Sequence, residues 1–175
     1  MQGQIEYSRT FGKHDVNALF VYHQKEKVDN QPANDEYKVL PYREQGLAGR
    51  FTYGYDNRYL MEFNFGYNGS ENFAPRNRYG FFPSVGLGWV ISNESFWDGI
   101  RKTVSNLKIR VSYGLAGNDA LGERFPYRSI VAMGEESGFY YNWNSQGKGP
   151  KITTYGNPNA TWEEAKKLDV GLELG

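Results

Sequence analysis

The amino-acid sequence predicts an all-β chain of antiparallel strands, and three observations favour a transmembrane β-barrel. Apolar and polar residues alternate in several runs of about ten residues, so that each strand has two unlike faces. Aromatic residues make up 17% of the chain, with 14 Tyr among them, and they gather near the ends of these runs. Short and long connections alternate along the chain, as expected for strands that cross a membrane back and forth.

The clearest alternation lies in residues 47–55 and 59–70. Their apolar faces lie together in only one parity, because a slip of one residue turns every side chain to the other face. We therefore expect a hairpin in which Tyr55 pairs with Tyr59, Tyr53 with Met61, and Phe51 with Phe63. The loop of residues 56–58 then needs a left-handed backbone position, which Asn57 or Arg58 would supply.

Five further strands follow from the same alternation. Their apolar positions are Ile5, Tyr7 and Phe11; Val16, Ala18, Phe20 and Tyr22; Phe81, Val85, Leu87, Trp89 and Ile91; Leu107, Ile109, Val111, Tyr113 and Leu115; and Leu168, Val170, Leu172 and Leu174. The second run is mixed, since Leu19 and Val21 would face the polar side. In the third run Phe82 and Val90 depart from the alternation.

The connections divide into two kinds. Residues 12–15 and 56–58 form tight turns, whereas residues 29–43 and 71–79 form longer loops. Residues 93–106 fall on the short-turn side, yet their apolar spacing predicts a short amphipathic helix capped by Asn93. The apolar positions of that helix are Phe96, Trp97, Ile100 and Val104. In the long region of residues 117–160, the pieces RSIVAM and GFYYNW predict a small hairpin.

A soluble β-sandwich that binds carbohydrate is the competing prediction, because its strands also alternate. A sandwich face is usually rich in Val, Ile and Leu, whereas here Tyr53, Tyr55 and Tyr59 surround one turn and Tyr67 lies at the far end. Aromatic girdles of a membrane barrel produce that distribution. About seven strands cannot close a barrel, however, and hydrocarbon tolerates no open sheet edge. The barrel prediction therefore requires the chain to be a fragment of a larger barrel.

Three stretches carry a resemblance to a known family: DNRYLMEFNFGYNGSENFAPRNRYGFFPSVGLGWVISNESF, LKIRVSYGLAGND and NPNATWEEAKKLDVGLELG. They closely resemble the barrel of the SusC/RagA family of TonB-linked (TonB-dependent) outer-membrane transporters. The resemblance runs in order over residues 42–175. Its motifs include Asn77-Arg78, Gly88-Trp89 and Gly117-Asn118-Asp119.

The resemblance implies a 22-stranded barrel plugged by an N-terminal domain, in the outer membrane of a Gram-negative bacterium. It implies import of oligosaccharides or peptides, a SusD-like surface lipoprotein as a lid, and energy from TonB. It covers barrel sequence alone, so we expect the plug and the TonB-contacting segment to lie outside this chain. Residues 1–175 would then be a partial barrel in contact with outer-membrane lipids.

The family topology places long loops outside the cell, so residues 117–160 would form an extracellular loop. Its aromatic residues are candidates for stacking on sugar rings, or else they pack the loop together: Tyr127, Tyr140, Tyr141 and Trp143. The polar face of the strands would line the lumen, where its residues bind the plug or satisfy one another. These lumen-facing candidates are Arg50, Thr52, Glu62, Asn64, Lys108 and Arg110.

Composition argues against several other classes of protein. The formal net charge is zero, so the basic surface typical of a nucleic-acid binder is missing. The chain has no cysteine, and His14 and His23 lack a companion carboxylate at metal-ligand spacing. Glu135-Glu136 and Glu163-Glu164 are adjacent, and neighbours in a strand point to opposite faces. We therefore expect no cofactor and no enzyme activity, and rank an enzyme sited in the lumen last.

Overall fold

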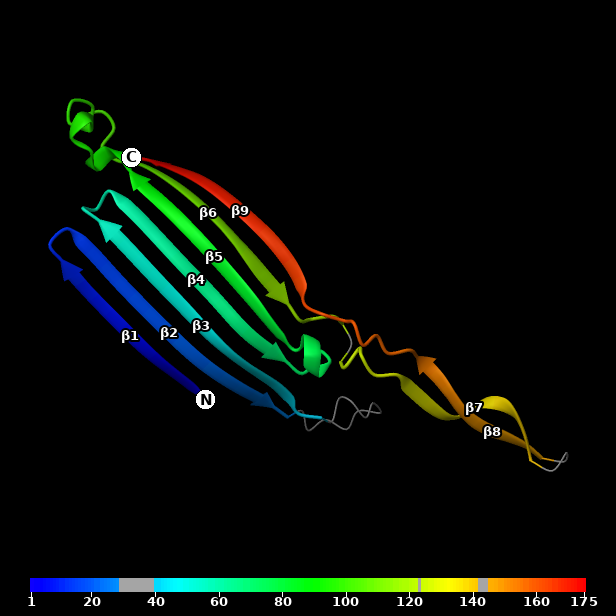
Figure 1. The fold of residues 1–175 in the computed structure, drawn as a ribbon. Coiled ribbons are helices and arrows are strands. Elements are labelled where there is room, and N and C mark those ends of the chain that lie inside the picture. The colour runs from blue at the N-terminus through cyan, green and yellow to red at the C-terminus, as the bar shows by residue number, and fades with distance from the viewer. Residues whose placement is uncertain (29–39, 123, 142–144) are drawn as a thin grey trace.

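The computed structural model describes residues 1–28, 40–122, 124–141 and 145–175, with backbone alone over residues 133–141 and 145–148. The fold is all-β (Figure 1). Seven antiparallel strands form one sheet in the order β1-β2-β3-β4-β5-β6-β9, and β7 and β8 form a separate hairpin. The sheet strands are β1 Gln2–Phe11, β2 His14–Lys27, β3 Tyr42–Tyr55, β4 Tyr59–Ser70, β5 Tyr79–Val90, β6 Leu107–Asn118 and β9 Glu163–Leu174.

The hairpin strands are β7 Ile130–Tyr141 and β8 Ser145–Thr154, and the helical segments are the short 3-10 helices η1 Pro75–Asn77, η2 Ile91–Asn93 and η3 Ser95–Trp97. In the described part of the chain, no helix has the length and apolar character needed to cross a membrane. The expectation of about seven long antiparallel strands is confirmed.

The register of the β3–β4 hairpin is the one that the alternation predicts. Tyr55 pairs with Tyr59, Tyr53 with Met61, and Phe51 with Phe63. The turn differs in one detail, because the positive φ angles lie at Asp56 and Asn57, both at 53°, and not at Arg58. The Arg58 backbone N–H donates to the Tyr55 carbonyl at 2.9 Å and closes the turn.

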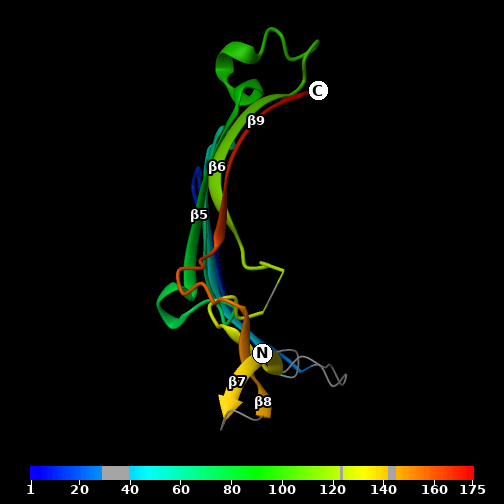
Figure 2. The same ribbon diagram turned by 90° about the vertical axis from the view of Figure 1, so that its right-hand side faces the viewer.

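The sheet is a single curved layer, seen edge-on in Figure 2. Its apolar residues remain exposed even in the central strands: the exposed fraction is 36% at Phe63, 37% at Phe51 and 52% at Leu87. A β-sandwich would bury this row under a second sheet, and the described residues provide none. The sandwich alternative is therefore not the fold of this chain.

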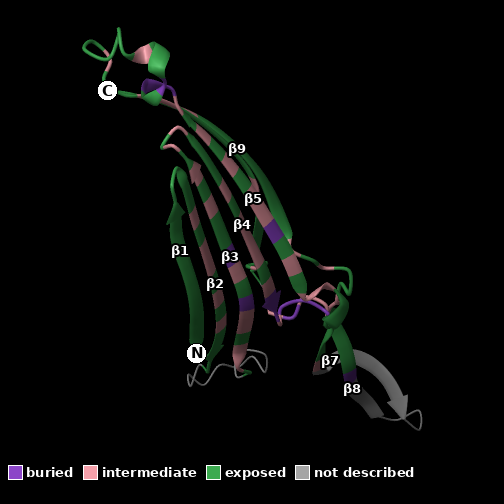
Figure 3. Ribbon diagram, turned by 60° about the vertical axis from the view of Figure 1, so that its left-hand side comes forward, coloured by how far each residue is buried: buried purple, intermediate pink, exposed green. Residues whose placement is uncertain are grey.

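Phe82 and a few glycines are buried within the strands, and the other buried side chains lie at or beyond the strand ends and not between layers (Figure 3). Phe73 is fully buried in the β4–β5 connection, where its ring lies 5.3 Å from that of Trp162. Phe82 packs on the same Trp162 at 5.2 Å, which explains its departure from the alternation. A small core thus joins the β4–β5 connection to the segment before β9.

The β5–β6 connection corrects one prediction. Residues 93–106 form no α-helix: only η3 is followed by turns, and Glu94 rather than Asn93 precedes η3. The Asn93 side chain instead donates to the Asn57 carbonyl at 2.7 Å. Ile91 is also not on the exposed apolar face, because it lies in η2 and is 8% exposed.

Residues 117–160 contain a hairpin, as predicted, but the strands that pair are not the predicted ones. RSIVAM and GFYYNW do not pair with each other, since most of both pieces belongs to β7 and their partner is β8. Three register shifts interrupt this ladder, and each shift changes which side chains share a face. Alternation therefore could not reveal the partner. Figure 1 shows the hairpin projecting beyond the end of the main sheet.

Candidate functional site

The polar face of the sheet brings together four of the predicted lumen residues. Arg50 pairs with Asn64, and Thr52 with Glu62, across the β3–β4 ladder. The Arg50 guanidinium lies 2.9 Å from the Glu62 carboxylate, to which the Asn64 amide also donates at 2.7 Å. Asn17 donates to the Thr52 hydroxyl at 3.2 Å. Arg50, Glu62 and Asn64 thus satisfy one another, and Thr52 lies beside Glu62 with Asn17 as its own partner.

The other two predicted lumen residues lie on the same face in β6, next to the edge strand β9. Lys108 and Arg110 both approach Glu173 of β9, at 3.7 and 3.6 Å. They do not join the group around Glu62. The structure thus places the six predicted residues on one face and in two separate groups.

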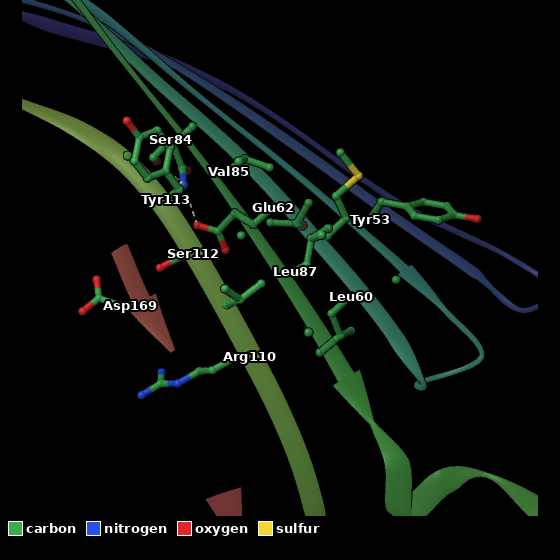
Figure 4. Close-up of a pocket in the computed structure, with 18 of the residues that line it drawn as sticks. Tyr53, Leu60, Glu62, Ser84, Val85, Leu87, Arg110, Ser112, Tyr113 and Asp169 are labelled. Atoms are coloured by element: carbon green, nitrogen blue, oxygen red, sulfur yellow. Dashed lines mark hydrogen bonds between the residues drawn. The ribbon is translucent and has the colours of Figure 1, made fainter. Parts of the chain in front are cut away.

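A hollow of about 770 Å³ lies between these two groups (Figure 4). Gly86 and Gly88 of β5 lie in its lining, together with Glu62, Arg110 and Ser112. A Cβ at Gly86 would meet its nearest atom, in Ser112, at an ordinary 3.7 Å. Gly86 and Gly88 have no side chains that would fill this space, and this part of the polar face is therefore concave.

Aromatic rings form a row at each end of the opposite, apolar face. At the short-turn end Tyr59 stacks between Tyr55 and Trp89, with ring centroids 6.4 Å apart on both sides. At the long-loop end Tyr67 stacks on Tyr79 at 5.2 Å. Between the rows lie apolar residues such as Phe63. Tyr and Trp prefer the boundary between apolar and wet surroundings, so the rows mark two such boundaries.

Acidic residues fix the short-turn end of the sheet. Glu94 accepts hydrogen bonds from the Tyr59 hydroxyl at 2.8 Å and the Trp89 indole at 3.2 Å, and Arg58 donates to it at 3.2 Å. The Tyr59 hydrogen bond is the main cause of the lowered pKa of Glu94. The hydrogen bond from Lys13 likewise lowers the pKa of Asp56. Both carboxylates therefore stay ionised at neutral pH.

Asp119 organises the long-loop end of the sheet. Its carboxylate accepts hydrogen bonds from the Ser70 hydroxyl at 2.6 Å and the Tyr42 hydroxyl at 2.9 Å. Its backbone carbonyl accepts from the Asn72 amide at 3.1 Å. Ser70 and Asn72 are buried, at 1% and 6% exposed. We call Tyr42, Ser70, Asn72 and Asp119 the Asp119 cluster.

Neither Glu94 nor Asp119 was among the site residues predicted from the sequence. Asp119 lies in the quoted motif Gly117-Asn118-Asp119, so the motif was the available signal. The only signal for Glu94 was a carboxylate shortly after Trp89, at the end of a strand.

Replacing Asp119 with Ala should loosen the long-loop end, because the Ser70 and Tyr42 hydroxyls would lose a shared acceptor. Hydrogen bonds to charged groups contribute about 1.5–3 kcal/mol each. We expect faster backbone hydrogen exchange in residues 70–78 and 119–122. Glu163→Gln is the control, since Glu163 accepts an exposed hydrogen bond from Asn118 at 3.0 Å; equal exchange in the two variants would contradict the role of Asp119.

The predicted stacking residues are not brought together by the described structure. Tyr127 contacts Phe125, with ring centroids 6.1 Å apart, and the Arg128 guanidinium lies 5.7 Å from the Tyr127 ring. Tyr140 and Tyr141 end β7, but their side chains lie outside the description, and Trp143 lies outside the described residues. For Tyr127 alone, these contacts are packing contacts within the loop. Among the described residues no cluster of His, Asp and Glu could hold a metal ion.

A single curved sheet with an exposed apolar face, aromatic rows at both ends and a polar inner face has the features of a barrel-wall segment. Comparisons with known proteins agree. TonB-dependent receptor P3 of Formosa agariphila is 28% identical over 99% of this chain and 19% of its own length. TonB-dependent receptor SusC of Bacteroides thetaiotaomicron is 32% identical over 73% of the chain and 12% of its own length.

Solved structures agree in fold. The RagAB peptide transporter superposes with a TM-score of 0.74 at 24% identity, over 99% of this chain and 21% of that one. The RagAB importer in its open-open state gives a TM-score of 0.72 at 25% identity. No family model matches the chain. The resemblance to SusC/RagA-type TonB-dependent receptors is thus confirmed, and the chain spans about a fifth or less of these proteins' length.

Proposed function

We propose that this chain forms part of the wall of a TonB-dependent importer in the outer membrane of a Gram-negative bacterium. The supporting observation is the apolar face, which extends over the seven strands and stays exposed where the structure describes it. Exposed apolar surface of this extent needs an apolar neighbour. Lipid on this face accounts for the exposure and also for the aromatic rows.

The polar face would then line the lumen. Arg50, Glu62 and Asn64 would meet water or the plug there, and the hollow between the two polar groups leaves room for a plug side chain. TonB would act through a segment outside this chain. The relatives are described as receptors and transporters, which agrees with a role other than enzyme catalysis.

The connection that contains β7 and β8 would form the extracellular loop, covering residues 117–160. It belongs to the long-loop end of the sheet, together with the Asp119 cluster. A SusD-like surface lipoprotein would close over this end. Tyr127, Tyr140, Tyr141 and Trp143 are our candidates for contact with an oligosaccharide or peptide substrate.

The need for detergent tests the proposal. The purified chain should aggregate or remain unfolded in water, because its apolar face and both sheet edges, β1 and β9, need partners. Sedimentation velocity and circular dichroism with and without detergent would measure this. A folded, soluble monomer without detergent would contradict a position in the membrane.

A further inference from the structure

The β5–β6 connection, residues 91–106, begins against the apolar face of the sheet. Trp89 and Tyr59 belong to the stacked aromatic row of that face, and both donate hydrogen bonds to Glu94. The Glu94 carboxylate thus lies beside the aromatic row, a few residues after β5 ends. The connection therefore continues the apolar face beyond the short-turn end of the sheet.

The connection is held in a defined shape. The Arg101 guanidinium donates to the Ser92 carbonyl at 2.6 Å, and the Trp97 indole donates to the Val104 carbonyl at 3.0 Å. Backbone hydrogen bonds from Arg101 to Trp97 and from Val104 to Ile100, at 3.1 and 3.0 Å, add helix-like turns. These contacts hold the backbone that carries Phe96 and Ile100.

Two large apolar side chains project from this connection without cover in the described structure. Phe96 is 64% exposed and Ile100 is 49% exposed. Both side chains belong to the same short, hydrogen-bonded connection, and together they are its exposed apolar patch. Exposed Lys102 follows, whereas the guanidinium of Arg101 is held by the Ser92 carbonyl and by Asp98 at 3.4 Å. Apolar side chains beside basic ones are typical of segments in the headgroup region of a bilayer.

We infer that residues 95–104 form an interfacial anchor, in which Phe96 and Ile100 enter the boundary between headgroups and acyl chains. Lys102 then meets the phospholipid phosphates. The inference rests on the proposed position of the sheet in the membrane. Its support is continuity with the aromatic row through Glu94 and the position of the basic residue Lys102 close to the apolar patch. Lipid is the occupant because that face already needs lipid along the whole sheet.

Fluorescence quenching tests the anchor in the complete receptor. Residues 1–175 contain no cysteine; with any cysteine elsewhere in the receptor replaced, a single introduced Cys carries the label. An environment-sensitive dye would be placed by Phe96→Cys, by Met61→Cys on the lipid face, or by Lys13→Cys, whose side chain is 63% exposed at the β1–β2 turn. Each receptor would be placed in vesicles of phosphatidylethanolamine and phosphatidylglycerol with nitroxide-labelled lipid.

The Phe96 label should be quenched by the nitroxide lipid as strongly as the Met61 label. Iodide in the buffer should quench it several-fold less than the Lys13 label. Iodide quenching equal to that at Lys13 would overturn the anchor, and so would protection from both quenchers, which would show a protein partner over the patch. If the Met61 label also escaped the lipid quencher, the proposed membrane position would fail, and the anchor with it.

Discussion

Replacing Phe63 with Arg should destabilise the complete receptor in the membrane by about 2–4 kcal/mol. Phe63 lies midway along β4, with Phe51 and Val85 as its cross-strand neighbours. A guanidinium in this row would lie in hydrocarbon, away from both aromatic rows and far from water. Denaturant unfolding of the receptor in lipid vesicles would measure the loss.

Asn64→Arg is the matched control, because it places the same charge one residue away on the opposite face. Asn64 donates to the Glu62 carboxylate at 2.7 Å, and a guanidinium in its place could make a similar contact. This variant should therefore be tolerated. Equal losses in the two variants would show that the two faces meet the same surroundings, and the barrel assignment would fail.

The sheet could be predicted from the sequence because its side chains follow a period of two. Once Phe51 and Phe63 must share a face, parity and the short loop of residues 56–58 together fix their pairing, and the observed register agrees. In β2, where the alternation is mixed, the predicted faces are also the observed ones. The predicted outward residue Phe20 contacts the Phe51 ring at 5.1 Å, whereas Leu19 pairs with Arg50 on the polar face.

The connections could not be predicted in this way, because side-chain contacts decide their shape. The spacing of Phe96, Trp97 and Ile100 suits a helix, and two helix-like backbone hydrogen bonds do form. A full α-helix is absent because Arg101 folds back to the Ser92 carbonyl and Trp97 to the Val104 carbonyl. These contacts shape a compact turn that reaches from β5 to the adjacent β6.

The Asp119 cluster shows the same limit at the other end of the sheet. Asp119 lies 49 positions from Ser70 and 77 from Tyr42 in the sequence. Strand register brings the ends of β3, β4 and β6 to one side of the sheet, but it does not say which loop residues meet there. The motif Gly117-Asn118-Asp119 was the only sequence signal for this cluster, and it does not indicate which residues bind Asp119.

Replacing Phe73 with Ala should cost about 3–5 kcal/mol, the usual range for a large aromatic residue in a packed core. Phe73 is fully buried and contacts the Trp162 ring, and Trp162 in turn donates from its indole to the Arg78 carbonyl at 3.2 Å. The cavity left by Ala would weaken the hold of the β4–β5 connection on the segment before β9. Hydrogen exchange of residues 71–78 and 155–162 should show joint opening.

Phe81→Ala is the control, because Phe81 is the same residue type near the same end of the sheet but is 53% exposed on the apolar face. Lipid can fill the space that its ring leaves, so no cavity forms and the cost should be well below that of Phe73→Ala. Similar exchange in the two variants would mean that Phe73 does not hold the loops. A large effect confined to Phe73 would show that the long-loop end has its own protein core, in contrast to the sheet below it, where lipid takes the place of a second layer.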